Sequence, residues 1–248
     1  MKKYILIFLT LFFVFSCKTP KLLVSKVEAS LTEIKNQAPV NAFEQEIAPY
    51  RAIMEKEINT VLSYTPTTIS RKDGILESSL GNLMADMCYQ QANPIFYART
   101  GKTIDFALFN NGGLRSDIQQ GNITVGHAFE LMPFENTLLV VEMTGDKIIE
   151  IVQFLIAENK AHPVSKQFNL LIKKNDYQLN INNLPFDKNK TYHVLTSDYL
   201  QGGGDNMNFF KNPIQITDLD YKVRNAIIDY FLKTKHIQTQ LEGRIKIE

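Results

Sequence analysis

The stretch IDFALFNNGGLR, residues 104–115, joins a strand pattern to a sharp turn and one arginine. Ile104 to Leu108 carries β-branched and aromatic residues and no helix-favouring run, which predicts a strand. The two glycines that follow allow a tight turn and a close approach of bare backbone to a neighbouring group. Arg115 then brings a permanently charged fork suited to phosphate or carboxylate oxygens. On these residues alone, a ligand loop and a structural turn in which Arg115 caps a carbonyl are equally good interpretations.

Two further stretches have the same character. LMPFENT (131–137) and DYLQGGGDN (198–206) also place glycines or a proline beside an aromatic residue, an amide and a charge. Such loops on a rigid scaffold are where binding residues tend to lie. A ligand with a flat ring, a diol and a phosphate would suit them, because aromatic rings stack on bases and a carboxylate accepts from ribose hydroxyls. The candidate side chains are Asn110, Arg115, Phe134, Asn136, Tyr199 and Asp205. Taken singly, Phe134 also fits a core plug and the glycine triplet an ordinary turn.

The rest of the chain alternates helix and strand patterns. Apolar residues at helical spacing predict helices over 41–64, from about Ser78, over 145–160 and over 221–235. Alternating or continuous apolar runs predict strands over 137–143, 168–174, 177–181, 192–200 and 243–248. The order shows no strict βαβ rhythm, so a mixed α+β domain over residues 44–248 fits best.

The N-terminus has the pattern of a secretory leader. Two lysines precede an apolar run from Tyr4 to Phe15, which is shorter than the ~20 residues of a membrane-spanning helix. The ending VFSC resembles a bacterial lipobox. We therefore expect a lipoprotein signal peptide over residues 1–16, lipidation at Cys17 and a tether over 17–43, in the envelope of a Gram-negative bacterium, facing the periplasm or on the outer membrane. An ordinary signal peptide or an uncleaved anchor is the alternative.

Charge and cysteine content argue against two functions, nucleic-acid binding and cysteine-based catalysis. A net charge of +1 without a basic run gives no electrostatic case for nucleic-acid binding. The second cysteine, Cys88, lies in an apolar helical pattern with no obvious base nearby, so we expect a small buried hydrophobic residue and not a nucleophile.

Several ordered motifs together resemble one known family. Residues 107–145, ALFNNGGLRSDIQQGNITVGHAFELMPFENTLLVVEMTG, closely resemble the C-terminal domain of the 5′-nucleotidase and UDP-sugar hydrolase family. LTSDYLQGGGDNMNFF (195–210) is similar to its second signature, LGNLMADMCYQQA (80–92) to its first domain helix, and IAPYRAIMEKEINTVL (47–62) to the helix that joins its two domains. The resemblance covers residues 46–247 and implies a four-layer α/β/β/α fold.

The resemblance also implies roles for single residues. Phe134 and Tyr199 match the aromatics that stack on the two faces of the base, and Asp205 matches the carboxylate that holds the ribose hydroxyls. Asn110 and Arg115 match the amide and guanidinium on the base and ribose-phosphate sides, and Asn136 matches a polar residue beside the base. The glycines of these loops, Gly112, Gly113, Gly203 and Gly204, complete the expected substrate-binding set.

Two positions depart from the family pattern. Family members commonly carry an arginine a few residues before the GN of the first helix, and this chain has Leu76 at about that place, which implies a weaker grip on phosphate. Tyr199 replaces the more usual phenylalanine, which is a mild change because a phenol ring stacks equally well and adds a polar tip.

The metal-binding half of such enzymes has no counterpart in this sequence. A dinuclear site needs clustered His, Asp and Asn ligands, and none of the histidines at 127, 162, 193 and 236 stands in such an arrangement. We read these histidines as surface or hydrogen-bonded residues, and expect no catalytic residue and no cofactor in this chain.

Two functions remain open. The first is a nucleotide-recognition subunit of a 5′-nucleotidase-type phosphohydrolase in nucleotide catabolism, whose divalent metals belong to a separately encoded metallophosphatase. The second is a non-catalytic, lipid-anchored protein that captures nucleotides or nucleosides for uptake or sensing. The position of Leu76 leans towards the second.

Overall fold

A computed structural model describes residues 24, 26–33 and 40–248 of the chain. The expected signal peptide (1–16), Cys17 and parts of the expected tether lie outside the described residues. The chain divides into two compact units, residues 1–45 and 46–248, and the second contains the hydrophobic core. Among the described residues, no helix has the length and apolar character needed to cross a membrane.

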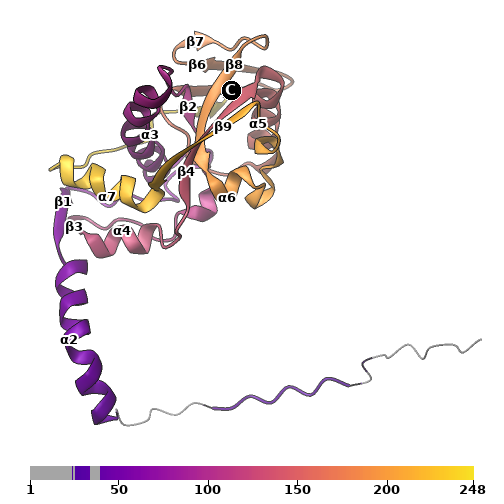
Figure 1. The fold of residues 1–248 in the computed structure, drawn as a ribbon. Coiled ribbons are helices and arrows are strands. Elements are labelled where there is room, and N and C mark those ends of the chain that lie inside the picture. Colours follow the sequence, from indigo (N-terminus) through magenta and orange to yellow (C-terminus); the bar gives the residue numbers. More distant parts are fainter. Residues whose placement is uncertain (1–23, 25, 34–39) are drawn as a thin grey trace, which may run out of the picture. The chain divides into compact units, whose positions relative to one another are not determined.

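A four-stranded mixed sheet forms the centre of the second unit (Figure 1). Its strands, in spatial order, are β2 (Phe106–Ala107), β8 (Thr191–Ser197), β4 (Thr137–Thr144) and β9 (Gln215–Lys222). β2 runs parallel to β8, whereas β4 runs antiparallel to both β8 and β9. Helices α3 (Ser79–Thr100) and α5 (Gly145–Glu158) flank this sheet. Because both faces are covered, β4 is a nearly continuous apolar run.

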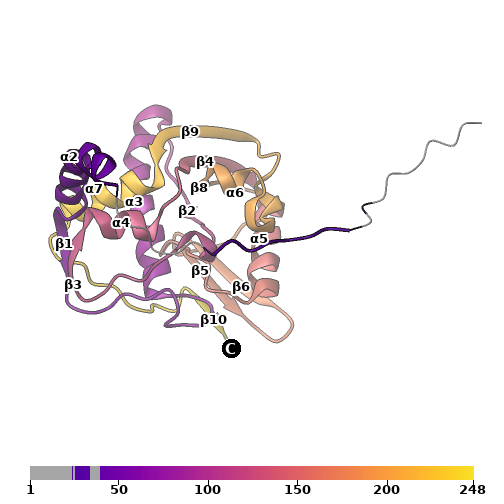
Figure 2. The ribbon, with the colours of Figure 1, turned by 90° about the horizontal axis from the view of Figure 1, so that it is seen from below.

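A second sheet packs against the first (Figure 2). It consists of β10 (Ile245–Ile247), β5 (Phe168–Ile172), β6 (Tyr177–Ile181) and β7 (Leu184–Pro185), with β10 parallel to β5 and the other pairs antiparallel. Phe106 of β2 and Phe168 of β5 join the two sheets, with their ring centroids 4.9 Å apart. The α+β class with mixed sheets, expected from the sequence, is thus confirmed.

Helix α3 begins where the sequence predicts, at Ser78. Ser78 caps its first turn by accepting a hydrogen bond from the Gly81 backbone, and Gly101 ends it with a φ of 71°. Cys88 lies on the buried face of this helix, and burial raises the pKa of its thiol. The thiol is therefore a core group, as expected.

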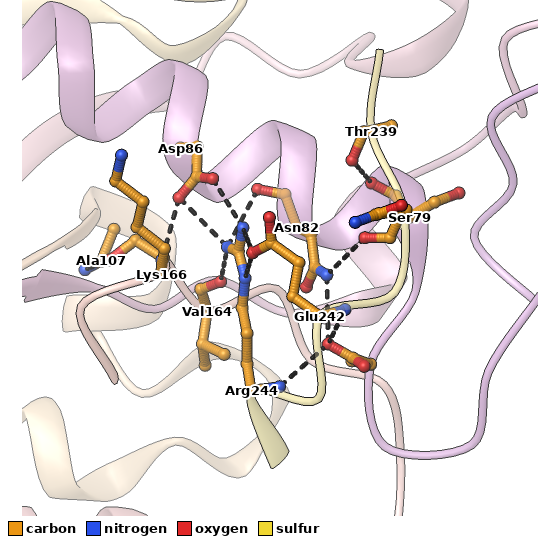
Figure 3. Close-up of polar contacts among 12 residues, drawn as sticks. Ser79, Asn82, Asp86, Ala107, Val164, Lys166, Thr239, Glu242 and Arg244 are labelled. Carbon is orange, nitrogen blue, oxygen red and sulfur yellow. Dashed lines mark hydrogen bonds and ion pairs between the residues drawn. The ribbon is translucent and has the colours of Figure 1, made fainter. Parts of the chain in front are cut away.

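A buried ion network ties the C-terminal segment to α3 (Figure 3). Arg244, only 3% exposed, pairs with Asp86 of α3 at 2.6 Å and with Glu242 at 2.7 Å, and donates to the Val164 carbonyl at 2.7 Å. Just before α3, Glu77 accepts backbone N–H groups from residues 242–244. These bonds hold β10 in place beside β5.

Three expected element boundaries are wrong. The helix expected over 41–64 is α2 (Asn41–Ile58), and the chain then forms strand β1 (Val61–Thr65), which pairs with β3 (Gly121–Thr124). The strand expected over 192–200 ends at Ser197, because the Ser197 side chain caps the short helix α6 (Asp198–Gln201). The first two residues of the last expected helix belong to β9, and α7 spans Val223–Lys233.

Candidate functional site

The three glycine- or proline-containing loops meet at one edge of the central sheet. The first follows β2 and forms a short 3₁₀ turn, η2 (Asn111–Gly113), and the third follows β8 through α6 and η3 (Gly204–Asn206). The second joins α4 (Val125–Leu131) to β4. β2 and β8 are parallel and β4 is antiparallel to β8, so the ends of β2 and β8 and the start of β4 share this edge.

A cavity of about 250 Å³ opens between the loops. Its lining consists of Asn110, Gly112, Gly113, Arg115, Phe134, Asn136, Tyr199 and Asp205. Eight of the ten residues expected to bind substrate thus surround one space. The other two residues, Gly203 and Gly204, lie in the third loop but not in the lining of the cavity. The binding role of all ten remains a prediction.

Asp205 stands at the centre of the polar contacts in this cavity. One carboxylate oxygen accepts the Tyr199 hydroxyl at 2.8 Å, and the other accepts the Asn110 amide at 2.6 Å. The bond to Asp205 raises the pKa of the Tyr199 phenol. Each carboxylate oxygen thus already accepts one protein donor, and the hydroxyls of a diol would share these oxygens with Tyr199 and Asn110.

Three glycines, one in the first loop and two in the third, lie where a side chain would not fit easily. A Cβ on Gly112 would lie 3.2 Å from the Asp205 carboxylate, and a Cβ on Gly204 would lie 2.5 Å from the Tyr199 ring. Gly203 has a φ of 91°, which a residue with a side chain rarely adopts. Gly112 therefore allows the first loop to approach the third, whereas Gly203 and Gly204 shape the third loop around the Tyr199 ring.

The aromatic and cationic side chains remain open to solvent. Phe134 is 40% exposed and Tyr199 is 47% exposed, although both border a cavity. The Arg115 guanidinium carbon lies 5.7 Å from the centroid of the Phe134 ring. Its one hydrogen bond to the Gly112 carbonyl is long, at 3.4 Å, and no carboxylate in the described part of the chain pairs with it. Its charge is thus free to meet an anion.

A second cavity, of about 380 Å³, adjoins the first and shares Gly112 and Asp205 with it. His162 lies in its wall, is 5% exposed, and accepts the Asn111 backbone N–H at 3.3 Å through Nδ1. Burial lowers the pKa of His162 to about 4, so the ring is neutral at pH 7. It is a hydrogen-bonded histidine, as expected, and its bond to Asn111 holds the backbone of the first loop.

Sequence reasoning missed the residues that hold the second loop. Lys222 and Arg224, at the junction of β9 and α7, hydrogen-bond to residues 132–137. Nothing in the local sequence around them signals this contact, since it joins segments about 90 residues apart in the chain. As for metals, the described residues contain no group of three or more His, Cys, Asp or Glu side chains able to hold an ion.

Comparison with known proteins identifies the family of this chain from its sequence. The family model described as 5′-nucleotidase, C-terminal domain, matches residues 57–212. The cell wall protein Lmo0130 of Listeria monocytogenes is 34% identical over 187 residues, covering 68% of this chain and 23% of that protein. The trifunctional nucleotide phosphoesterase YfkN of Bacillus subtilis is 26% identical over 232 residues, covering 82% of this chain and 15% of that protein.

Among solved structures, the 5′-nucleotidase precursor of Thermus thermophilus shares the fold. Its TM-score is 0.68 at 23% identity, over 85% of this chain and 44% of that one. The chain therefore spans less than half the length of each of these proteins.

Proposed function

The chain belongs to the family of 5′-nucleotidase C-terminal domains, and from that premise we propose that it is the nucleotide-recognition domain of a 5′-nucleotidase-type phosphohydrolase in nucleotide catabolism. One observation carries the proposal. Three loops that are separate in sequence meet around a single cavity. They place there two exposed aromatic rings, a carboxylate that accepts two hydrogen bonds, and a guanidinium with no carboxylate partner in the described part of the chain.

Each part of a nucleotide has a counterpart in this arrangement. The base stacks between Phe134 and Tyr199, the ribose hydroxyls donate to Asp205, and the phosphate meets Arg115. The cavity of 250 Å³ is smaller than the roughly 300–1,000 Å³ of typical ligand pockets. In this proposal it holds the nucleoside, and the phosphate lies at the open side of the cavity beside the exposed Arg115.

Calorimetric titration of the full chain tests this assignment. AMP, adenosine and UDP-glucose are titrated into the wild type and into Phe134→Ala and Asp205→Ala. Stacking contributes about 1–3 kcal/mol per base, so Phe134→Ala should weaken AMP binding about fivefold or more. Tyr97→Ala, which removes an exposed aromatic ring from α3 away from the cavity, is the control. Equal affinities for Phe134→Ala and Tyr97→Ala would remove the base from this cavity.

The catalytic metals belong, in this proposal, to a separately encoded metallophosphatase. Helix α2 supports a partner, since it buries none of its residues. Five of its apolar side chains are 37–73% exposed: Ile47, Tyr50, Ile53, Met54 and Ile58. An apolar stripe of this kind is a contact surface.

Reconstitution with a metallophosphatase encoded beside this chain tests the partnership. We expect the chain to raise AMP hydrolysis by that enzyme and to leave hydrolysis of p-nitrophenyl phosphate unchanged, because the latter has no nucleoside to bind. Ile53→Glu on α2 and Asp205→Ala in the cavity should each abolish the gain. A gain that survives both substitutions would refute the recognition role.

A non-catalytic nucleoside-binding protein for capture or uptake is the second candidate. Leu76, which stands where the resemblance led us to expect an arginine, is buried in the core and brings no charge to the site. Adenosine binding as tightly as AMP would favour this function. Tighter binding of AMP would favour the phosphohydrolase.

The location is proposed on separate grounds. One relative is named a cell wall protein, which is consistent with a place in the cell envelope. We propose a lipid anchor on Cys17, in the envelope of a Gram-negative cell. Cys17→Ser should then abolish metabolic labelling with palmitate and move the protein from the membrane fraction to the soluble fraction. Labelling that persists would exclude this anchor.

A further inference from the structure

The loop that presents Phe134 is held by residues from the C-terminal part of the chain. Arg224 donates to the Met132 carbonyl at 3.1 Å and pairs with the Glu135 carboxylate. Lys222 donates to the Glu135 carbonyl at 2.8 Å and to the Thr137 hydroxyl at 3.0 Å. The loop is thus fixed on both sides of Phe134.

The backbone of Val223, which lies between Lys222 and Arg224, adds a further bond to the loop. The Val223 N–H donates to the Asn136 carbonyl at 2.9 Å. Three carbonyls of the loop, at residues 132, 135 and 136, therefore accept hydrogen bonds from the segment 222–224. Phe134 and Asn136, the two side chains that this loop gives to the cavity, lie within the region so fixed.

Burying the charged side chain of Arg224 carries a desolvation penalty that an apolar residue at this position would avoid. Its side chain is 9% exposed, and burial lowers its pKa because the guanidinium is removed from water. Its guanidinium stacks over Phe129 of α4 at 4.1 Å, which orients the fork towards the loop. An apolar residue would fill the same space without the desolvation penalty but could not bind the loop.

We propose that Lys222 and Arg224 are positioning residues for the nucleotide site, which hold Phe134 and Asn136 in the geometry that binds the base. The inference rests on the proposed function in assigning a base to the cavity. Both residues lie outside the stretch 57–212 matched by the family model. Phe134 is 40% exposed, so core packing alone does not fix its ring. Without the bonds from Lys222 and Arg224, the loop would have to be ordered each time a nucleotide binds, which would cost binding free energy.

A single tryptophan can report on the loop directly. The chain contains no tryptophan, so Phe134→Trp places a unique fluorophore at the stacking position. Steady-state anisotropy of this residue is measured in the full chain without ligand, and AMP affinity is measured by its quenching. Arg224→Met, Lys222→Met and Glu135→Ala are introduced into this background. Glu135→Ala is included because Glu135 is exposed and its removal leaves the core intact.

Arg99→Met is the matched control. Arg99 also donates to two backbone carbonyls, those of Asp218 and Leu219, but these lie on β9 and away from the loop. We expect Arg224→Met to lower the anisotropy and to weaken AMP binding about tenfold. Lys222→Met and Glu135→Ala should do the same to a smaller extent, and Arg99→Met should lower the melting temperature only.

The outcomes separate the two proposals. A fall in melting temperature for Arg224→Met, with anisotropy and affinity equal to those of Arg99→Met, would reduce Arg224 to a structural residue and overturn the inference. If no variant binds AMP but the anisotropy still falls for Arg224→Met and not for Arg99→Met, the positioning role stands and the nucleotide assignment fails.

Discussion

At the scale of single residues, the hydroxyl of Tyr199 would compete with the ribose of the proposed nucleotide. It donates to the same Asp205 carboxylate that the ribose hydroxyls would use. Tyr199→Phe keeps the stacking ring and frees one carboxylate oxygen. Since a hydrogen bond to a protein group contributes about 1 kcal/mol net, we expect AMP to bind about fivefold more tightly to this variant by calorimetry.

The control for this prediction is the ligand. 2′,3′-Dideoxyadenosine monophosphate has no hydroxyls to donate, so its affinity should be unchanged by Tyr199→Phe. Weaker AMP binding to the variant would mean that the phenol contacts the ligand itself, and the competition between hydroxyls would be disproved.

Two neighbouring glycines give a second test in the third loop. A Cβ on Gly204 would meet the Tyr199 ring at 2.5 Å, whereas a Cβ on Gly202 would meet only backbone oxygens at 3.5 Å. The ring is exposed and can swing away, so Gly204→Ala should displace it without unfolding the protein. We expect about tenfold weaker AMP binding for Gly204→Ala and wild-type binding for Gly202→Ala, with melting temperatures close to that of the wild type.

Local sequence motifs predict most of the residues that line the cavity, but they do not predict the residues that hold its loops in place. Glycines beside an aromatic and a charge are a local signal, which is why Phe134 and Asp205 could be singled out before the fold was known. Arg224 has no such signal, because its role depends on a bond to Met132 that forms only in the folded chain.

At the scale of elements, Glu77 secures the C-terminal strand. Burial alone would raise the pKa of its carboxyl, but hydrogen bonds from Asn82 and from the backbone of residues 242–244 hold it below the ordinary value of 4.5. A lowered folded-state pKa means that this stabilisation is present above about pH 4.5 and is lost as the pH falls further. Glu77→Gln should therefore cost about 1–2 kcal/mol at pH 7 and less at pH 3, as measured by urea unfolding.

Glu150→Gln provides the comparison. Glu150 pairs with Lys147 on the exposed face of α5, where a pair three residues apart contributes about 0.2–0.5 kcal/mol. An equal loss of stability for the two variants would show that the Glu77 network does not hold the strand.

Element boundaries fail where partners are distant. Val61 to Thr65 continues the apolar pattern of α2, but pairing with β3, about 60 residues later, makes it a strand. Similarly, β9 was not predicted as a strand, because it becomes one only by pairing with β4. Helices α3 and α5 were predicted correctly, since their apolar periodicity is local.

At the scale of the whole molecule, stability should come from the second unit. The buried core residues run from Leu62 to Ile245, and α2 contributes none. Removal of residues 1–45 should therefore leave the urea midpoint and the slope of the unfolding transition unchanged. A lower midpoint for the shortened chain would reveal packing of the N-terminal unit on the core.

The cavity is closed by contacts between distant parts of the chain. Asn110 and Asp205 are 95 residues apart in sequence, and Met132 and Arg224 are 92 apart. Because contacts between residues so far apart in sequence carry a loop-closure cost, we expect them to form late in folding. A partly folded chain would then lack the cavity, so under the proposed function the capacity to bind a nucleotide would report that folding is complete.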